Sequence, residues 1–490
     1  MDDQRPPRLA LAMGKRFLLA GVVIATLSAT ATATAVLLQI HGVAKELQRG
    51  HKIDVGHGLT AADAGAPETF MILGSDHRAS EGGIPGNSDT ILLARLDPNK
   101  SSIAMMSIPR DLAVTLRLRN GQVRPNQKIN AAYANGGPRL ALATVKQLLG
   151  IPINHVIDVN FGGFRHAVNH VGCIYTDVDR RYFNDNSGGE PYAQIDLQPG
   201  YQKLCDYDAL AYVRYRHEDT DLVRAARQQD FLRDAKDQLG AQKLFDDRNA
   251  LIRIFAKYAD TDIRGDAQIV QLAKLVAFSA GHPVREVHFR STVGPSYVTA
   301  SPRQIRQNVT EFLNEDVTRS PISGPRTTRA QQQTNRRRPR RPRIPGGLER
   351  AKSDGESRAI EAAPKIPFTF YYPTLRLTGS AYADNPRTYK ITDLHHRRHN
   401  AYRMVIDKGT LGDFYGVEGM TWKNPPILSK PTGKQTINGR KFLLFTDGGR
   451  LRLVAWRTRR AVYWISNTLT LALNNDQMLA IAASTLPVGR

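Results

Sequence analysis

The residues from Phe17 to Ile40 form an apolar run that contains no charged side chain. As a helix, a run of this length rises about 36 Å, which is enough to cross the ~30 Å hydrocarbon core of a membrane. Four basic residues precede the run: Arg5, Arg8, Lys15 and Arg16. Because positive residues favour the cytoplasmic side, we expect a cytoplasmic tail at 1–16, one transmembrane helix at 17–40 and an extracytoplasmic remainder. The small residues at Ala29–Ala31 leave a cleaved signal peptide open as the alternative.

Cys173 and Cys205 are the only two cysteines of the chain. In an oxidising compartment such a pair can form a disulfide. The bridge would close a loop of about 33 residues and stabilise the fold by roughly 3 to 4 kcal/mol in the chain-entropy description. Two buried free thiols are the alternative, but export favours the disulfide.

Short apolar segments alternate with segments of helical spacing between about residues 68 and 316. The expected strands include Phe70–Leu73, Thr90–Leu96, Ile103–Ile108, Asn154–Asn160, Cys173–Val178 and Val284–Phe289. The expected helices include Pro138–Leu149, Phe164–His170, Asp206–Tyr212, Asp221–Leu239 and Pro302–Asn314. Such alternation is typical of a layered α/β domain.

Three other regions differ in composition. Residues 41–67 are expected to be a polar spacer, and residues 317–367, with RRRPRRPR at their centre, a disordered cationic linker. Residues 368–490 contain the hairpin pattern KFLLFTD-GG-RLRLVAWRT and a terminal helical stretch, so we expect a smaller α+β accessory domain. The net charge of +23 favours polyanionic neighbours. The preceding membrane segment argues against nucleic acid among them.

Two acids occupy corresponding places at strand ends. Asp76 follows the first expected strand, and Asp89 opens the next. Carboxylates that face each other repel unless a cation lies between them, and Mg²⁺ takes carboxylate oxygens together with phosphate oxygens. The alternative is a pair of turn-forming residues that cap their own backbone.

Several arginines follow in the chain. Arg110 lies where the third expected strand leaves the sheet, a usual place for ligands in α/β folds. Arg214, Arg216, Arg224 and Arg227 lie within the stretch YVRYRHEDTDLVRAARQQ, with Gln228 beside them. Guanidinium groups are rigid forks that suit phosphate. A solvated helix face, paired with local acids, is the alternative.

Five segments, in this order, resemble the LytR-CpsA-Psr family: GSDHR, SDTILLARLDPNKSSIAMMSIPRD, KINAAYANGG, IPINHVIDVNFGGF and ALAYVRYR…DLVRAARQQ. The resemblance implies a bacterial, membrane-anchored envelope enzyme whose catalytic domain has a central mixed sheet flanked by helices. It implies transfer of a glycopolymer from a polyprenyl-pyrophosphate carrier to peptidoglycan, with pyrophosphatase activity as a possible accompaniment.

The resemblance also implies roles for single residues. It places Mg²⁺, or alternatively Mn²⁺, on Asp76 and Asp89, and it makes these two acids and Arg110 catalytic. The residues implied to bind pyrophosphate are Arg78, Arg110, Arg214, Arg216, Arg224, Arg227 and Gln228. Two positions depart from the family pattern: Asn87 stands where many relatives carry arginine, and Val223 where they often carry glycine.

Two functions of other classes compete with the transferase. The first is a membrane-tethered scaffold that holds anionic wall polymers through the cationic linker and the accessory domain. The second is a membrane-bound transcriptional attenuator, which would need a cytoplasmic C-terminus.

Overall fold

The computed structural model describes most of the chain from residue 53 onward. The described residues are 53, 55–63, 65–75, 88–100, 102–187, 194–215, 219–246, parts of 254–282, 283–294, 296–314, 344–409 and 412–489, with the backbone alone for Asp89 and 240–246. The predicted membrane segment 17–40 lies outside them, as do Asp76, Arg78 and Arg216. Among the residues described, no helix combines the length and the apolar character needed to cross a membrane.

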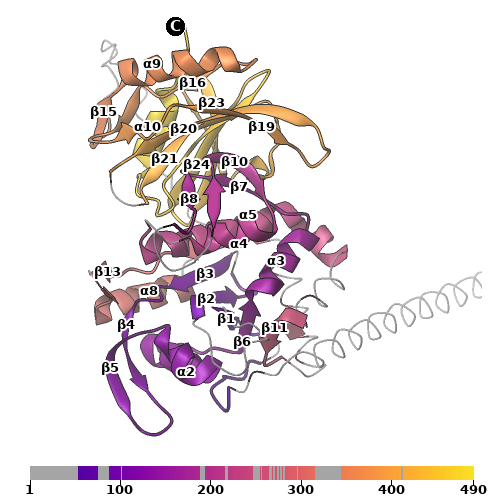
Figure 1. Cartoon of the computed structure of the whole chain (residues 1–490), viewed down its shortest axis with the longest axis vertical. Helices are drawn as coiled ribbons and strands as arrows, with labels where there is room; N and C mark the ends of the chain where they lie inside the picture. The colour runs from indigo at the N-terminus through magenta and orange to yellow at the C-terminus, as the bar shows by residue number, and fades with distance from the viewer. Residues whose placement is uncertain are drawn as a thin grey trace, which may run out of the picture.

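A six-stranded mixed sheet forms the centre of the first unit, in the order β11-β6-β1-β2-β3-β12 (Figure 1). Its strands are β1 (Glu68–Ser75), β2 (Ser88–Leu96), β3 (Ile103–Ile108), β6 (His155–Asn160), β11 (Ala259–Thr261) and β12 (Val284–Val287). β6 runs parallel to β1, and β12 parallel to β3, while β2 is antiparallel to both β1 and β3. The expected mixed sheet is therefore confirmed, and β1, β3, β6 and β12 end at the same edge.

Helices cover both faces of this sheet. α2 (Ala131–Leu149) and α8 (Pro302–Asn314) share one buried apolar cluster with β1, β2 and β3, to which they contribute Leu142, Val145 and Phe312. α5 (Asp221–Asp246) lies on the other face, where Gln228 contacts Thr90 of β2. Ile91 and Leu93 point into the first cluster and Leu92 into a separate one, as expected for a strand buried on both sides.

The helix predicted from Pro138 begins earlier, at Ala131, and has a kink. Gly136 and Gly137 have non-helical backbone angles, and the φ of 60° at Gly137 is one that glycine adopts without strain. The break explains why the sequence pattern starts only at Pro138, because proline fits the first turn of the second segment.

Smaller elements complete the first unit. They are β4 (Ala113–Arg117), β5 (Val123–Lys128), α3 (Phe161–His170), β7 (Ile174–Val178), β8 (Tyr182–Asn184), β9 (Ile195–Leu197), β10 (Gly200–Leu204), α4 (Asp206–Arg214), β13 (Thr292–Val293) and β14 (Val298–Thr299). Cys173 and Cys205 form the predicted disulfide. It joins the residue before β7 to the residue before α4, and thereby fixes where α4 begins.

The second unit is built on an eight-stranded antiparallel sheet. Its strands are β18 (Ala381–Tyr382), β19 (Arg387–Thr392), β20 (Arg398–Asp407), β21 (Phe414–Met420), β22 (Gly433–Ile437), β23 (Arg440–Asp447), β24 (Arg450–Arg457) and β25 (Val462–Ser466). The predicted hairpin with a Gly-Gly turn is confirmed as β23 and β24. Around the sheet lie β15 (Leu348–Arg350), α9 (Lys352–Ala362), η1 (Ala363–Lys365), β16 (Tyr371–Tyr372), β17 (Leu375–Leu377), η2 (Pro426–Leu428), α10 (Asn475–Ala483) and β26 (Leu486–Pro487).

Two predicted boundaries are wrong. The linker predicted for 317–367 includes α9, whose Ala359 and Ala362 are buried in the core of the second unit. The buried face of α9 consists only of small side chains, Gly355, Ala359 and Ala362, which give a weak apolar signal in the sequence. The spacer predicted for 41–67 includes Ile53 and Val55, which are buried in the core of the first unit.

The two units share an aromatic core. Tyr175 of β7 and Tyr201 of β10 lie in one buried cluster with Trp422 and Trp464 of the second unit, and the rings of Tyr175 and Trp422 meet edge to face at 5.2 Å. Figure 1 shows β7 and β10 between α5 and the strands of the second unit. Asp177 of β7 also accepts a hydrogen bond from Trp464 Nε1 at 2.9 Å. The second unit is therefore packed firmly onto the first.

Candidate functional site

The residues that directly precede the two predicted metal ligands are paired neighbours in the sheet. Asp76 directly follows Ser75, the last residue of β1, and Asp89 directly follows Ser88, the residue of β2 that pairs with Ser75. The register shifts here, because Gly74 pairs with Thr90, so position 89 is the extra residue of a β-bulge. Bulges recur beside active sites. Asp76 and the side chain of Asp89 lie outside the described residues, so their sharing of a cation stays a prediction.

Arg110 and Arg224 meet at one carboxylate, that of Asp221. Arg224 Nη2 lies 2.5 Å and Arg110 Nε 3.7 Å from Asp221 Oδ1. The backbone N–H of Asp111 donates to Asp221 Oδ2 at 3.2 Å. The first turn of α5 is thereby fixed to the segment that follows β3. Asp221 therefore brings together two arginines that the sequence singled out.

Lys128 adds a third cation to this cluster. Its Nζ lies 2.9 Å from Asp111 Oδ1, and its side chain is 37% exposed. Arg110, Lys128 and Arg224 thus gather three cations around the carboxylates of Asp111 and Asp221. A cluster of cations that is partly exposed at Lys128 favours an anionic ligand.

Gln228 fixes α5 against the start of β2. Its Nε2 donates to Thr90 Oγ1 and to the carbonyl of Val213, both at 3.0 Å. Thr90 directly follows Asp89, and Val213 directly precedes Arg214. The amide of Gln228 thus joins two of the predicted site segments.

Arg214 lies at the carboxyl end of β6. Its guanidinium carbon is 4.0 Å from the ring centroid of Phe161, the first residue of α3 and the residue that follows β6. Because the sheet order is β6-β1-β2-β3, the ends of β1 and β2 lie between Arg214 and the Arg110 cluster. Strands are spaced by about 4.8 Å, so roughly 14 Å separates β6 from β3.

Arg227 has a different environment from Arg224. Its side chain is 0% exposed, and it donates to Asp219 and to the carbonyl of Tyr215. Rings of Tyr182, Tyr212 and Tyr215 surround the guanidinium. Tyr215 and Asp219 flank the segment that contains Arg216, which lies outside the described residues. The structure therefore places Arg227 where it holds both ends of that segment, inside the protein and not at its surface.

Tyr133 was not singled out from the sequence, although it lies within KINAAYANGG. Its hydroxyl donates to Asp158 Oδ2, a residue of β6 whose backbone pairs with Leu73 of β1. Burial, and then the charge of Asp158, raises the pKa of Tyr133 far above its usual value. Tyr133 therefore remains a hydrogen-bond donor and fixes α2 beneath the ends of β1 and β6.

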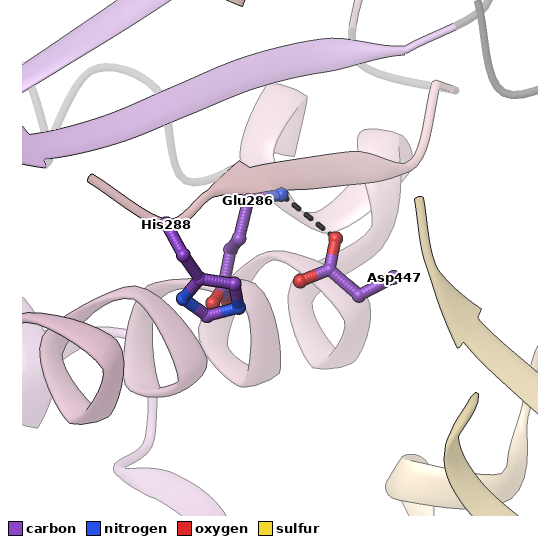
Figure 2. Close-up of side chains that lie close together, drawn as sticks. All are labelled: Glu286, His288 and Asp447. Carbon is purple, nitrogen blue, oxygen red and sulfur yellow. Dashed lines mark hydrogen bonds between the residues drawn. The ribbon is translucent and has the colours of Figure 1, made fainter. Parts of the chain in front are cut away.

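A second group of possible metal ligands lies between the units. Figure 2 shows Glu286, His288 and Asp447 together, with the N–H of Glu286 donating to Asp447 Oδ1 at 2.8 Å. One ligand atom from each lies within 4.8 Å of the others. Arg233 pairs with Glu286 and also with Asp447 Oδ2, at 2.9 Å. The guanidinium already pairs with both carboxylates, so the group acts as a buried ionic contact that joins β12, α5 and β23.

The family model described as the LytR_cpsA_psr family matches residues 32–311 of the chain. Among curated proteins, the polyisoprenyl-teichoic acid–peptidoglycan teichoic acid transferase TagV of Bacillus subtilis is 28% identical over 274 residues, which cover 56% of this chain and 66% of TagV. The TagU protein of Halalkalibacterium halodurans, with the same descriptive name, is 32% identical over 228 residues, which cover 44% of this chain and 69% of TagU. Other curated relatives are matched over only about half of their length.

Solved structures are similar over a comparable part of the chain. The crystal structure of B. subtilis TagV has 26% identity and a TM-score of 0.42, and the alignment covers 51% of this chain and 98% of that one. A LytR-Csp2A-Psr enzyme from Actinomyces oris has 18% identity and a TM-score of 0.42, with 54% of this chain and 95% of that one covered.

Proposed function

Because the chain belongs to the LytR-CpsA-Psr family, we propose that it is a phosphotransferase that moves a glycopolymer from a polyprenyl-pyrophosphate carrier to peptidoglycan. The names of its relatives specify teichoic acid as the polymer and peptidoglycan as the acceptor. For this chain we propose the broader class, an anionic glycopolymer. We further propose a membrane-anchored, extracytoplasmic location, which is supported by the apolar run at 17–40 and by the disulfide.

One observation carries the proposal: the described parts of the predicted motifs lie along one edge of the first sheet. Ser75 and Ser88, which directly precede Asp76 and Asp89 in the sequence, lie between Arg214 on one side and the Arg110 cluster on the other. A diphosphate needs positive charge around its oxygens while one of its bonds breaks. The sheet edge offers that charge on two sides of the two acids.

The residue types at this edge fit a magnesium ion. Asp76 and Asp89 directly follow a pair of neighbouring residues, beside a bulge that leaves position 89 out of the ladder. Their carboxylates are the oxygen ligands that Mg²⁺ prefers. Asp76 and Asp89 would hold the ion. When bound, it would withdraw charge from the phosphoryl oxygens.

The protein groups would divide the remaining work. Arg110, Arg224 and Arg214 bind diphosphate oxygens, and Arg227 positions the segment that carries Arg216. One carboxylate of the acid pair accepts the proton of the acceptor hydroxyl. The acceptor oxygen then bonds to the phosphorus attached to the sugar, the bond from this phosphorus to the bridging oxygen breaks, and polyprenyl phosphate leaves.

A transfer assay tests the proposal. The full chain, a lipid-linked glycopolymer and peptidoglycan fragments should yield a phosphodiester-linked product that requires Mg²⁺. Arg110→Ala should lower the rate by a factor on the order of 10³, whereas Arg459→Ala, on an exposed turn of the second unit, should not. An unchanged rate in Arg110→Ala would refute the site. Polymer retention without any product would favour the scaffold function instead.

A further inference from the structure

A shallow groove of about 550 Å³ lies between α8 and the segment that follows β12. Seven residues line it: Arg290, Arg303, Arg306, Gln307, Thr310, Glu311 and Asn314. The buried side chain of Asn308 fixes its walls to each other, because it accepts from the N–H of Arg290 at 2.8 Å and donates to the carbonyl of Arg290 at 3.1 Å. The groove is therefore a fixed feature of the first unit.

The groove is positively charged in a way that helix stability does not explain. Arg303 and Arg306 lie exposed in the first turns of α8, where cations are disfavoured by the helix dipole. Across the described part of the chain, neither of them forms an ion pair. Arg290 pairs with Glu311, and its side chain remains 49% exposed. Two guanidinium groups and part of a third thus face solvent together.

The remaining lining is polar and uncharged. Gln307, Thr310 and Asn314 are exposed, and with Arg303 they follow one another at spacings of three and four residues, so they form one stripe along α8. The stripe is about 16 Å long at the rise of an α-helix. A stripe that begins with guanidinium groups and continues with amides and a hydroxyl suits an extended chain that carries both phosphates and hydroxyl groups.

The segment that leads from β12 to the groove leaves the sheet at the same edge as Arg110. β12 is the neighbour of β3 and runs parallel to it, so Arg290, three residues beyond β12, and Arg110, two residues beyond β3, leave the sheet at the same edge. Val298 of β14 donates to the carbonyl of Asp111 at 3.0 Å. The β13–β14 hairpin therefore connects the two places, and Figure 1 shows β13 beside α8.

We propose that this groove binds the phosphodiester chain of the glycopolymer, beyond the pyrophosphate that the Arg110 cluster holds. The identity of the ligand rests on the proposed function, but the binding of an anionic polyol chain does not. The groove would let the protein select donors whose chain repeats a negative charge, and Arg303 and Arg306 are the specificity-determining residues.

The first test measures binding of a fluorescent glycerol-phosphate oligomer to the full-length protein in detergent. Arg303→Ala/Arg306→Ala should weaken binding about tenfold, the effect of losing two exposed ion pairs. Alanine favours helix, and circular dichroism checks that α8 is kept. Arg459→Ala/Arg460→Ala, which removes the same charge from an exposed turn of the second unit, should change the affinity less than twofold. An equal loss of affinity in both double variants would contradict binding at the groove and would indicate that net charge alone binds the oligomer.

Glu311→Gln gives a test of opposite sign. Removal of this carboxylate frees Arg290 and should tighten binding of the oligomer, by about twofold to threefold. Weaker or unchanged binding would contradict the assignment of Arg290 to the groove.

Two further experiments are needed. One distinguishes a lipid headgroup from the glycopolymer as the source of the bound phosphate, and the other separates this inference from the proposed function. Vesicles of anionic lipid should bind wild type and Arg303→Ala/Arg306→Ala equally, and loss of vesicle binding alone would make the surface a membrane contact instead.

Arg110→Ala should retain the oligomer although it loses transfer. If neither the wild type nor any variant transfers polymer, but Arg303 and Arg306 still determine the affinity for the oligomer, the binding role of the groove is supported and the transferase proposal fails.

Discussion

At the scale of single residues, the arrangement of the arginines depends on two acids that are far from some of their partners in the sequence. Asp221 joins Arg110 to Arg224, although 110 residues separate Asp221 from the N–H of Asp111 that it also binds. Asp219 instead draws Arg227 into the interior. The sequence singled out these arginines but did not predict that they divide between Asp221 and Asp219, because the division requires the end of β3 and the start of α5 to be in contact.

Asp221→Asn should lower the rate of polymer transfer about 10²-fold, because Arg110 and Arg224 lose their common partner and a small displacement of such groups costs that much. The amide keeps an acceptor for the N–H of Asp111, so the fold should persist. Initial rates with saturating donor measure the effect. Asp237→Asn, on the same helix, is the matched control and should stay near the wild-type rate. If the Asp221→Asn variant transfers polymer as fast as wild type, Asp221 does not position the arginines for the reaction.

Val223 illustrates how a departure from the family pattern has a structural reason. It is buried with Ala226 against Leu469 of the second unit, so the position that is often glycine in relatives serves here as a contact between units. The sequence shows the departure, and only the packing of the second unit explains it.

At the scale of elements, the sequence predicts a helix or strand correctly where the element contains its own turn or start residues. β23 and β24 are joined by Gly448 and Gly449, and the φ of 53° at Gly448 is of the kind a tight hairpin requires. α8 begins with Pro302 and matches the predicted range. α9 was missed because its buried face consists of small side chains, Gly355, Ala359 and Ala362. Their burial depends on the second unit, and periodicity does not report it.

The disulfide provides the prediction at this scale. Cys173→Ser/Cys205→Ser should lower the free energy of unfolding by about 3 kcal/mol, because the bridge closes a loop of about 33 residues. Thermal unfolding of the oxidised protein, the reduced protein and the double variant measures the loss. The reduced protein and the variant should agree. If all three unfold at one temperature, the bridge does not stabilise the start of α4.

At the scale of the whole molecule, the two units are joined by an aromatic cluster and by buried charges. Asp234 of α5 lies beside the second unit, with Arg452 Nη1 4.0 Å from its Oδ1, and Thr176 donates to its Oδ2 at 2.7 Å. Burial raises the pKa of Asp234 from 3.8 to about 7, although Arg452 acts against the rise. Burial likewise raises the pKa of Glu286, which Arg233 only partly opposes.

The raised pKa of Asp234 predicts how stability depends on pH. The folded protein binds this proton more tightly than the unfolded chain does, so the stabilising contribution is present at low pH and is lost as pH rises through about 7. Asp234→Asn removes the titration. Between pH 5 and pH 8 the variant should therefore gain roughly 2 to 3 kcal/mol of unfolding free energy relative to wild type. Denaturation followed by fluorescence suits this test, because Trp422, Trp456 and Trp464 are the three tryptophans of the chain and all lie in the second unit. A difference that does not vary with pH would contradict the assignment.

The central claim is that Asp76 and Asp89 hold a divalent ion within reach of a diphosphate bound by the arginines. Electron paramagnetic resonance of Mn²⁺, added to the full-length protein with a polyprenyl-pyrophosphate analogue, tests it most directly. We expect one bound Mn²⁺ that shows coupling to phosphorus in wild type, loss of the bound ion in Asp89→Asn, and a bound ion without phosphorus coupling in Arg110→Ala. Bound Mn²⁺ with phosphorus coupling in Asp89→Asn, at wild-type affinity, would contradict the account.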